Sequence, residues 1–238
     1  MIRKIFVSEV DQSNLSKLKI VEETSSDISD YSNAVVLKPW GYEYLMFENE
    51  SLAIWILHLE KGHENSLHCH PRKKTSMVVL NGRIQVSTLK EWFELNRLDS
   101  VIYEEGVFHT QKALTDHVFL MEIETPPNKK DLVRLKDAYG RVGKGYEGSD
   151  KIAKELHLFE YVCFDKKDVR VGAKKRIKNV TISIKKHSPE SFSRKNDNKN
   201  KLFCVLEGKD LNVGNVIDDQ AVQISNNLLL LTIGLGNI

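Results

Sequence analysis

Residues 62–82 read GHENSLHCHPRKKTSMVVLNG, and this stretch contains the clearest pattern in the chain. Its histidines, His68 and His70, are separated by a single residue, and on a β-strand two such side chains point to the same face. Gly62 and Gly82 bound the stretch, as glycines commonly do where strands end in turns. The pattern therefore predicts a short strand that presents two imidazoles side by side, followed by a second, apolar strand.

A third histidine, His109, begins another predicted strand shortly after Gly106. Two imidazoles from one strand and a third from a neighbouring strand are a sound way to bind a divalent cation. We therefore predict a metal centre formed by His68, His70 and His109. Zn, Fe(II), Ni and Mn all suit a neutral three-histidine site, so the sequence does not choose among them.

Short β-rich runs surround these histidines. β-Branched and aromatic residues dominate the runs, and Gly, Asn and charged residues separate them. The run from Ile54 to Glu60 alternates only partly, as expected for a strand that is covered on both faces. Many short strands with turn signals predict a sandwich or barrel. The expected strands lie near 34–37, 42–48, 52–59, 66–68, 76–81, 83–89, 92–95, 100–103, 109–113 and 117–124.

The C-terminal third repeats this region faintly. Four matches in the same order indicate two copies of one β-unit, of which the second is shorter and more basic. The matches pair Val78–Gly82 with Cys204–Gly208, the strand ending at Leu59 with one ending at Ile184, Leu98–Ile102 with Val213–Ile217, and Val118–Ile123 with Leu228–Ile233.

Composition excludes several classes of protein. The chain has 238 residues and 41% hydrophobic residues, enough for one large or two small domains with a real core. Its 13 Gly and 5 Pro are too few for collagen, and its three cysteines form no CxxC pair. GxSxG and HExxH motifs are absent from the sequence. With no signal peptide and no long apolar run, we expect a soluble, cytoplasmic protein without membrane partners.

Charge is unevenly distributed, although the net formal charge is only +2. Residues 163–209 contain 14 Lys and Arg against 5 Asp and Glu. Such a block could attract an anion, a membrane face or nucleic acid. Aromatic residues are not interleaved with these lysines as in a base-stacking surface, so we predict a solvated face and no nucleic-acid partner.

Residues 62–82 and 106–109 together resemble the two motifs of the cupin superfamily. Both glycines and both histidines of the first motif have the expected spacing, and the second motif is matched by Gly106 and His109. Glu104 replaces the proline of the second motif, and Ala113 replaces its later Asn. The resemblance covers residues 38–125 well and the C-terminal third only as a degenerate copy.

The resemblance implies an all-β chain built on a double-stranded β-helix, or jelly roll. We expect an N-terminal arm over 1–33 and a cupin barrel with the metal site over 34–127. A linker follows over 128–160, with a Gly-rich basic loop and a short helix that Ser149 would cap. Residues 161–238 would form a second, smaller, degenerate cupin-like barrel. The whole chain would then be a bicupin with one active barrel, and related cupins suggest a homodimer.

One departure from the first motif concerns the metal. Thr75 stands where cupins usually have a glutamate ligand, and the other permitted spacing selects Lys74. Neither a neutral hydroxyl nor a protonated amine is a good ligand for a divalent cation. Three interpretations stay open: a three-histidine metal site, a site that recruits a carboxylate from Glu64 or Glu43, and a metal-free site.

Two further resemblances bear on the substrate. Lys38–Glu43 (KPWGYE) resembles the opening segment of phosphosugar isomerases of the mannose-6-phosphate isomerase kind, with Trp40 as a candidate substrate contact. Asp131–Glu147 is similar to a segment that follows the barrel in cupins of bacterial surface-polysaccharide pathways. Its Arg134, Arg141 and Lys144 could bind a phosphate, because guanidinium groups and glycine amides favour oxyanions.

The function suggested by these resemblances is isomerisation or epimerisation of a phosphosugar or sugar nucleotide, with a divalent metal as cofactor. Candidate proton carriers are Glu105, Tyr103, His63 and Glu122. One alternative is a three-histidine Fe(II) oxygenase. Another is a non-catalytic cupin that binds an anionic small molecule in a carbohydrate pathway.

Overall fold

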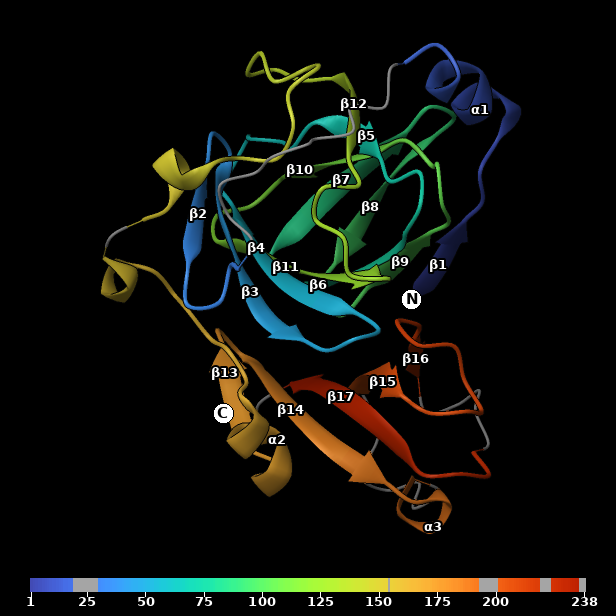
Figure 1. Ribbon diagram of the computed structural model, residues 1–238, viewed down its shortest axis with the longest axis vertical. Coiled ribbons are helices and arrows are strands. Elements are labelled where there is room, and N and C mark those ends of the chain that lie inside the picture. The colour runs from blue at the N-terminus through green and yellow to red at the C-terminus, as the bar shows by residue number, and fades with distance from the viewer. Residues whose placement is uncertain (19–29, 154, 193–200, 219–223, 236–238) are drawn as a thin grey trace.

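The computed structural model describes residues 1–18, 30–153, 155–192, 201–218 and 224–235, and it is mostly β (Figure 1). Three sheets contain its strands. The neighbouring strands of the first sheet are β1 (Ile2–Ile5), β9 (Ser100–Tyr103), β6 (Lys74–Asn81), β11 (Val118–Thr125), β4 (Ala53–Leu59), β3 (Gly41–Glu48) and β2 (Val35–Lys38). Those of the second are β12 (Val133–Lys136), β5 (Leu67–Cys69), β10 (His109–Ala113), β7 (Arg83–Thr88) and β8 (Trp92–Asn96).

The first two sheets face each other and form the jelly roll predicted for the N-terminal part of the chain. Apolar side chains from both sheets fill one end of the space between them, among them Leu57, Val79, Ile84, Val86 and Leu120. The motif glycines shape the turns: Gly62 and Gly82 both have φ of +82°, a conformation that a side chain rarely tolerates. The strands between Ala34 and Thr125 match the predicted ones to within about two residues.

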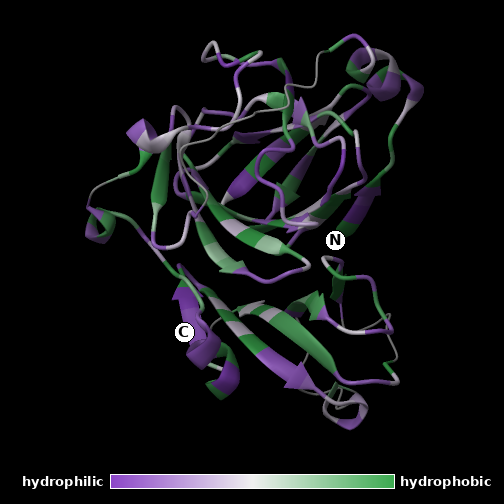
Figure 2. Ribbon diagram, in the orientation of Figure 1, coloured by the Kyte–Doolittle hydropathy of each residue, from purple (hydrophilic) through white to green (hydrophobic). Residues whose placement is uncertain are grey.

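The third sheet covers the outer face of the first. Its strands are β13 (Lys174–Ile177), β14 (Val180–His187), β17 (Leu228–Leu235), β15 (Lys201–Glu207) and β16 (Val216–Asp218). Side chains of the two sheets form one apolar cluster, to which Ile54, Ile56 and Met121 contribute from one side and Ile182 and Leu231 from the other. Strand β4 is thus buried on both faces, as its incomplete alternation predicted, and β17 is apolar along most of its length (Figure 2).

The internal repeat is real at the level of topology. The strands β9, β6, β11, β4 and β3 are neighbours in that order, and β16, β15, β17, β14 and β13 repeat the order. Even the turn hydrogen bonds agree, since the amides of Leu98 and Gly214 donate to the carbonyls of Val79 and Val205 at 2.8 Å each. Within the described residues the second unit consists of this one sheet, so the predicted smaller copy retains half of a jelly roll.

The linker differs from the prediction. In place of a helix beginning at Ser149 there are two short 3₁₀ turns, Ser149–Lys151 and Leu156–Leu158, and residue 154 between them is outside the described residues. Gly148 occupies the N-cap position and has no side chain to accept a hydrogen bond, so an α-helix is not stabilised there. The remaining helices are α1 (Glu9–Leu15), α2 (Lys166–Val171) and α3 (Pro189–Phe192).

The N-terminal arm extends the barrel. Strand β1 pairs in parallel with β9, and α1 follows with Ser8 and Asp11 forming a capping box. Asp11 also accepts a hydrogen bond from the backbone amide of Phe108 at 3.1 Å, next to His109. The rest of the predicted arm, residues 19–29, is outside the described residues.

Candidate metal centre

The three predicted histidines converge inside the barrel. His68 on β5 lies directly opposite His109 on β10, and His70 follows two residues after His68. One ligand nitrogen from each of the three side chains lies within 4.8 Å of those of the other two, and all three residues are buried. The amide of Gly106 donates to the carbonyl of His70 at 2.8 Å, which joins the two motif segments.

Backbone carbonyls orient the three rings. The Nδ1 atoms of His68, His70 and His109 lie 2.7, 2.6 and 2.9 Å from the carbonyl oxygens of Ser66, Asp131 and Val107. A carbonyl oxygen only accepts, so each Nδ1 must carry the proton and each Nε2 must have a free lone pair. Among the described residues, Nε2 of His70 and of His109 is buried with no hydrogen-bond partner. Those lone pairs fit a metal ion.

Burial keeps the imidazoles neutral, because a charged ring loses its hydration inside the barrel. The pKa values of His68 and His70 lie well below the ordinary histidine value, and burial lowers the pKa of His109 to about 4. The positive charge of Lys73 acts in the same direction on the pKa of His70. All three rings are therefore uncharged at neutral pH, which is the form that binds a cation.

The structure gives a reason for the absence of a glutamate at position 75. Thr75 is buried and its cross-strand neighbour on β11 is Glu124, so a carboxylate at position 75 would face a like charge. The carboxylate next to the histidines is Glu122 instead, whose Oε1 lies 3.9 Å from Nε2 of His70. Burial raises the pKa of Glu122.

Glu43 and Glu64, the candidates for a recruited carboxylate ligand, make other contacts. Glu43 points into the cavity but is paired with Lys38 and Lys129, each at 3.3 Å. Glu64 is half-buried and takes part in an isolated bridge with Lys112. Of the three carboxylates, only Glu122 has an ion-pair contact with one of the histidines among the described residues.

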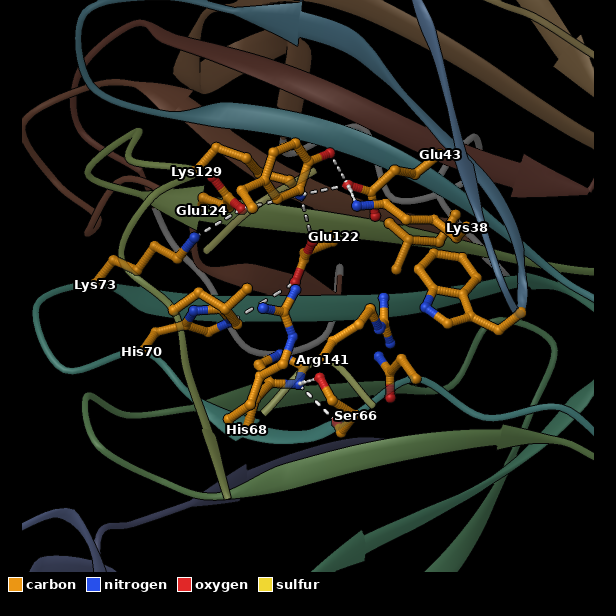
Figure 3. Close-up of a pocket in the computed structure, with 16 residues that line it drawn as sticks. Lys38, Glu43, Ser66, His68, His70, Lys73, Glu122, Glu124, Lys129 and Arg141 are labelled. Atoms are coloured by element: carbon orange, nitrogen blue, oxygen red, sulfur yellow. Dashed lines mark hydrogen bonds and ion pairs between the residues drawn. The ribbon is translucent and has the colours of Figure 1, made fainter. Parts of the chain in front are cut away.

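Lys129 connects the carboxylates of the cavity. Its ammonium nitrogen lies 3.3 Å from Glu43, Glu122 and Glu124, and 4.0 Å from the ring centre of Trp55. Burial alone would lower the pKa of Lys129, but the three carboxylates outweigh burial and raise it above the ordinary lysine value. Figure 3 shows Glu122 between Lys129 and His70.

Three of the four predicted substrate contacts reach this cavity. Trp40, Arg134 and Arg141 line it together with His68 and His70. Arg134 lies opposite His68 because β12 pairs with β5, so three neighbouring strands present Arg134, His68 and His109 in one row. The fourth contact, Lys144, is exposed on the Gly-rich loop and is not among the lining residues.

The predicted proton carriers are scattered. Glu122 lines the cavity, whereas Glu105 is exposed on the turn before β10 and His63 is half-buried outside it. Tyr103 is buried and stacks on the ring of His109 at a centroid distance of 3.9 Å. Its hydroxyl accepts a hydrogen bond from Gln111 at 3.0 Å, so Tyr103 supports the histidine rather than opening into the cavity.

Sequence reasoning missed most of the charged network. Lys73 pairs with Glu124 at 2.8 Å, and Lys129 was not predicted to be near the site. A signal did exist for the acids: Glu122 and Glu124 alternate with apolar residues on β11, which is covered on both faces. Met121 and Ile123 on the same strand pack against the third sheet, so the side chains of Glu122 and Glu124 point to the opposite face, into the barrel. The position of Lys129 has no comparable signal, because it depends on the path of a loop.

Comparison with known proteins finds no matching family model and no matching curated sequence. Among solved structures, the chain is similar to KdgF from Halomonas sp., with 18% identity and a TM-score of 0.39 over 44% of this chain and 96% of that one. It is also similar to an RmlC-like cupin from Shewanella frigidimarina (20% identity, TM-score 0.38, 44% and 95% covered). A third is the capsular polysaccharide assembling protein CapF from Staphylococcus aureus (16% identity, TM-score 0.38, 43% and 32% covered).

The fold is a jelly roll of two facing sheets, with a three-histidine cluster between them. Among the described residues, no helix is long and apolar enough to cross a membrane. The cysteines Cys69, Cys163 and Cys204 are free.

Proposed function

We propose that this chain is a metal-dependent isomerase or epimerase that acts on a phosphosugar or sugar nucleotide. The observation that supports the proposal is a buried carboxylate, Glu122, 3.9 Å from Nε2 of His70 in a cavity lined by cations. Isomerisation and epimerisation both require a group that takes a proton from carbon and returns it. Glu122 has the position for that role.

His68, His70 and His109 would hold the metal, which would polarise a carbonyl or enediolate oxygen of the substrate. Glu122 takes the proton on its Oε1 atom, and Lys129, 3.3 Å from its Oε2 atom, holds the carboxylate in place. Because burial raises the pKa of Glu122, its carboxylate is a stronger base than an exposed one.

Cations around the cavity favour an anionic substrate. Lys38, Arg134 and Arg141 line it together with the aromatic rings of Trp40 and Tyr146. Guanidinium groups bind phosphate oxygens through paired hydrogen bonds, so the phosphate would be held while the sugar carbon meets Glu122.

Proton exchange tests this proposal directly. Protein loaded in turn with Zn, Mn, Ni and Fe(II) is incubated with a panel of phosphosugars and sugar nucleotides in D₂O, and NMR follows deuterium incorporation at carbon. We expect incorporation with at least one substrate, and its loss in Glu122→Gln measured at saturating metal. The control variant is Glu105→Gln, which removes an exposed carboxylate outside the cavity and should exchange like the wild type.

Other outcomes would establish the alternatives. Oxygen consumption by the iron-loaded protein without deuterium incorporation would identify an oxygenase, for which three neutral histidines leave coordination positions open. Ligand binding with neither reaction would identify a non-catalytic cupin. The predicted homodimer is a separate proposal, and the molar mass in solution by light scattering tests it.

A further inference from the structure

Three cations that line the cavity come from separate segments and converge on one carboxylate. Glu147 is ion-paired with Lys38, lies 2.8 Å from Nη1 of Arg141 and 3.8 Å from Nη2 of Arg134. It is nearly buried, with a side chain 9% exposed. Lys38 ends β2, Arg134 lies on β12, and both Arg141 and Glu147 belong to the Gly-rich loop.

Arg134 has the least satisfied charge of the three cations. Its Nη1 atom donates to the carbonyls of Lys144 and Gly145 at 2.6 and 2.8 Å, and both carbonyls belong to the loop that carries Glu147. Among the described residues its Nε is buried without a partner, and its only ion pair is the long one with Glu147. If the loop moved, this guanidinium would face the cavity with all of its donors free.

The free volume of the cavity is also too small for a ligand while the loop is in this position. The cavity between the histidines and these cations measures about 50 Å³, whereas sites for small molecules usually measure about 300–1,000 Å³. Tyr146, next to Glu147, bonds to Glu43 and lies with its ring centre 3.8 Å from the nitrogen of Lys38. Tyr146 thus takes up space in the cavity, and Glu147 pairs with the three cations that an anionic ligand would need.

We infer that Lys38, Arg134 and Arg141 form the binding site for a phosphate group, and that Glu147 occupies this site until the phosphate of a ligand replaces it. The inference rests on the proposed function for the identity of the ligand, but not for the chemistry of the site. A phosphate dianion offers more acceptor oxygens than one carboxylate, so it can satisfy the unpartnered donor of Arg134 as well. Residues 144–148 would then move away from Arg134 while Arg141 stays at the phosphate, and the cavity would become larger.

Binding of inorganic phosphate to the metal-free full-length chain, measured by calorimetry in the presence of a chelator, tests the inference. Glu147→Gln keeps the size of the side chain but removes the competing charge, so phosphate should bind about tenfold more tightly than to wild type. Asp150→Asn is the matched control, because Asp150 is an exposed carboxylate three residues along the same segment, and it should change the affinity less than about twofold. Adding Arg141→Gln to Glu147→Gln should remove the gain.

Unchanged or weaker phosphate binding by Glu147→Gln would overturn the inference, as would an equal gain in Asp150→Asn. Acetate that binds as tightly as phosphate would overturn the assignment to a phosphate group. If Glu147→Gln does not fold, hydrogen exchange on the wild type decides: residues 144–148 should exchange faster with phosphate, and unchanged or slower exchange contradicts displacement. Because no metal or turnover is involved, failure here leaves the proposed isomerase standing, and failure of the isomerase leaves this site standing.

Discussion

The two β-units of this chain share one strand order, yet only the first holds a candidate site. Strands β5 and β10, which carry the histidines, belong to the second sheet of the jelly roll. The C-terminal unit has no counterpart of that sheet among the described residues. The five-strand sheet is therefore common to both units, whereas the facing sheet, which carries the histidines, is present only in the first.

The sheet of the C-terminal unit also lacks the buried charged residues that the first sheet directs into the barrel. Leu120 and Leu230 pair with Val79 and Val205 at equivalent positions, so Thr232 takes the place of Glu122. Where the first unit buries acids and lysines, the second packs an apolar cluster that includes Phe192, Phe203, Val205, Leu228 and Leu230. A buried charge is stable only with a partner. The C-terminal unit, which lacks the facing sheet among the described residues, accordingly buries apolar residues in place of paired charges.

The largest effect expected from this comparison concerns His109. His109→Ala removes one of three converging ligands, so metal content after dialysis should fall to background by elemental analysis. His187→Ala, at the end of β14 in the second unit, should leave full loading because no metal-binding cluster includes it among the described residues. Full occupancy in His109→Ala would rule out the proposed ligand set.

The next effect tests whether the second unit is a structural cover. Leu231 on β17 is fully buried against the first sheet, so Leu231→Ala should lower the free energy of unfolding by about 2–5 kcal/mol. Leu235→Ala, on the same strand but 44% exposed, should change it by less than about 0.5 kcal/mol. Denaturant titration followed by circular dichroism measures both, and equal values would contradict the packing described above.

A smaller effect compares equivalent positions in the two units. Glu122→Gln should weaken metal binding by about 10- to 100-fold, because it removes the negative charge nearest to the histidines. Thr232→Val, at the matching position of the second unit, should leave the affinity unchanged. Competition titration with a chromophoric chelator gives both constants. An affinity of Glu122→Gln equal to wild type would show that the histidines bind metal without help from this carboxylate.

The smallest effect concerns the basic block. Lys174 is exposed on β13, whose polar character is visible in Figure 2, and Lys174→Gln should alter stability by less than about 0.5 kcal/mol. Titration with duplex DNA should show only weak, salt-sensitive binding in both proteins. Tight binding that Lys174→Gln reduces would make this face a nucleic-acid surface and not a solvated one.

Prediction from sequence succeeded where local spacing determines geometry. His68 and His70 point the same way on any strand, and the glycines at 62 and 82 end the strands in turns. The repeat was detected through apolar runs, although hydrogen bonding shifts one match by a residue, so that Leu98 corresponds to Gly214 and not to Val213. The strand matched to the one ending at Leu59 was predicted to end at Ile184, but β14 runs on to His187. Its last residues are polar, so the apolar pattern stops before the strand does.

Prediction failed where a position depends on the path of the chain. Lys129 and Tyr146 reach the cavity because the segment after the barrel folds back and adds β12 beside β5. Glu105 was chosen as an acid next to the second motif and Lys144 as a cation of the Gly-rich loop, and both are exposed. A loop has no period that places its side chains, so spacing carries no information about which of them turns inward.

By itself, the sequence determined the all-β class, the strands of the jelly roll and the three histidines, because periodicity along a strand decides which side chains share a face. Tertiary structure alone decided that Glu122 would be the nearby carboxylate and that Lys129 would join three acids. It also decided that the second unit would cover the first as one sheet. These features arise where segments distant in sequence are brought together by burial of apolar surface, which no local pattern records.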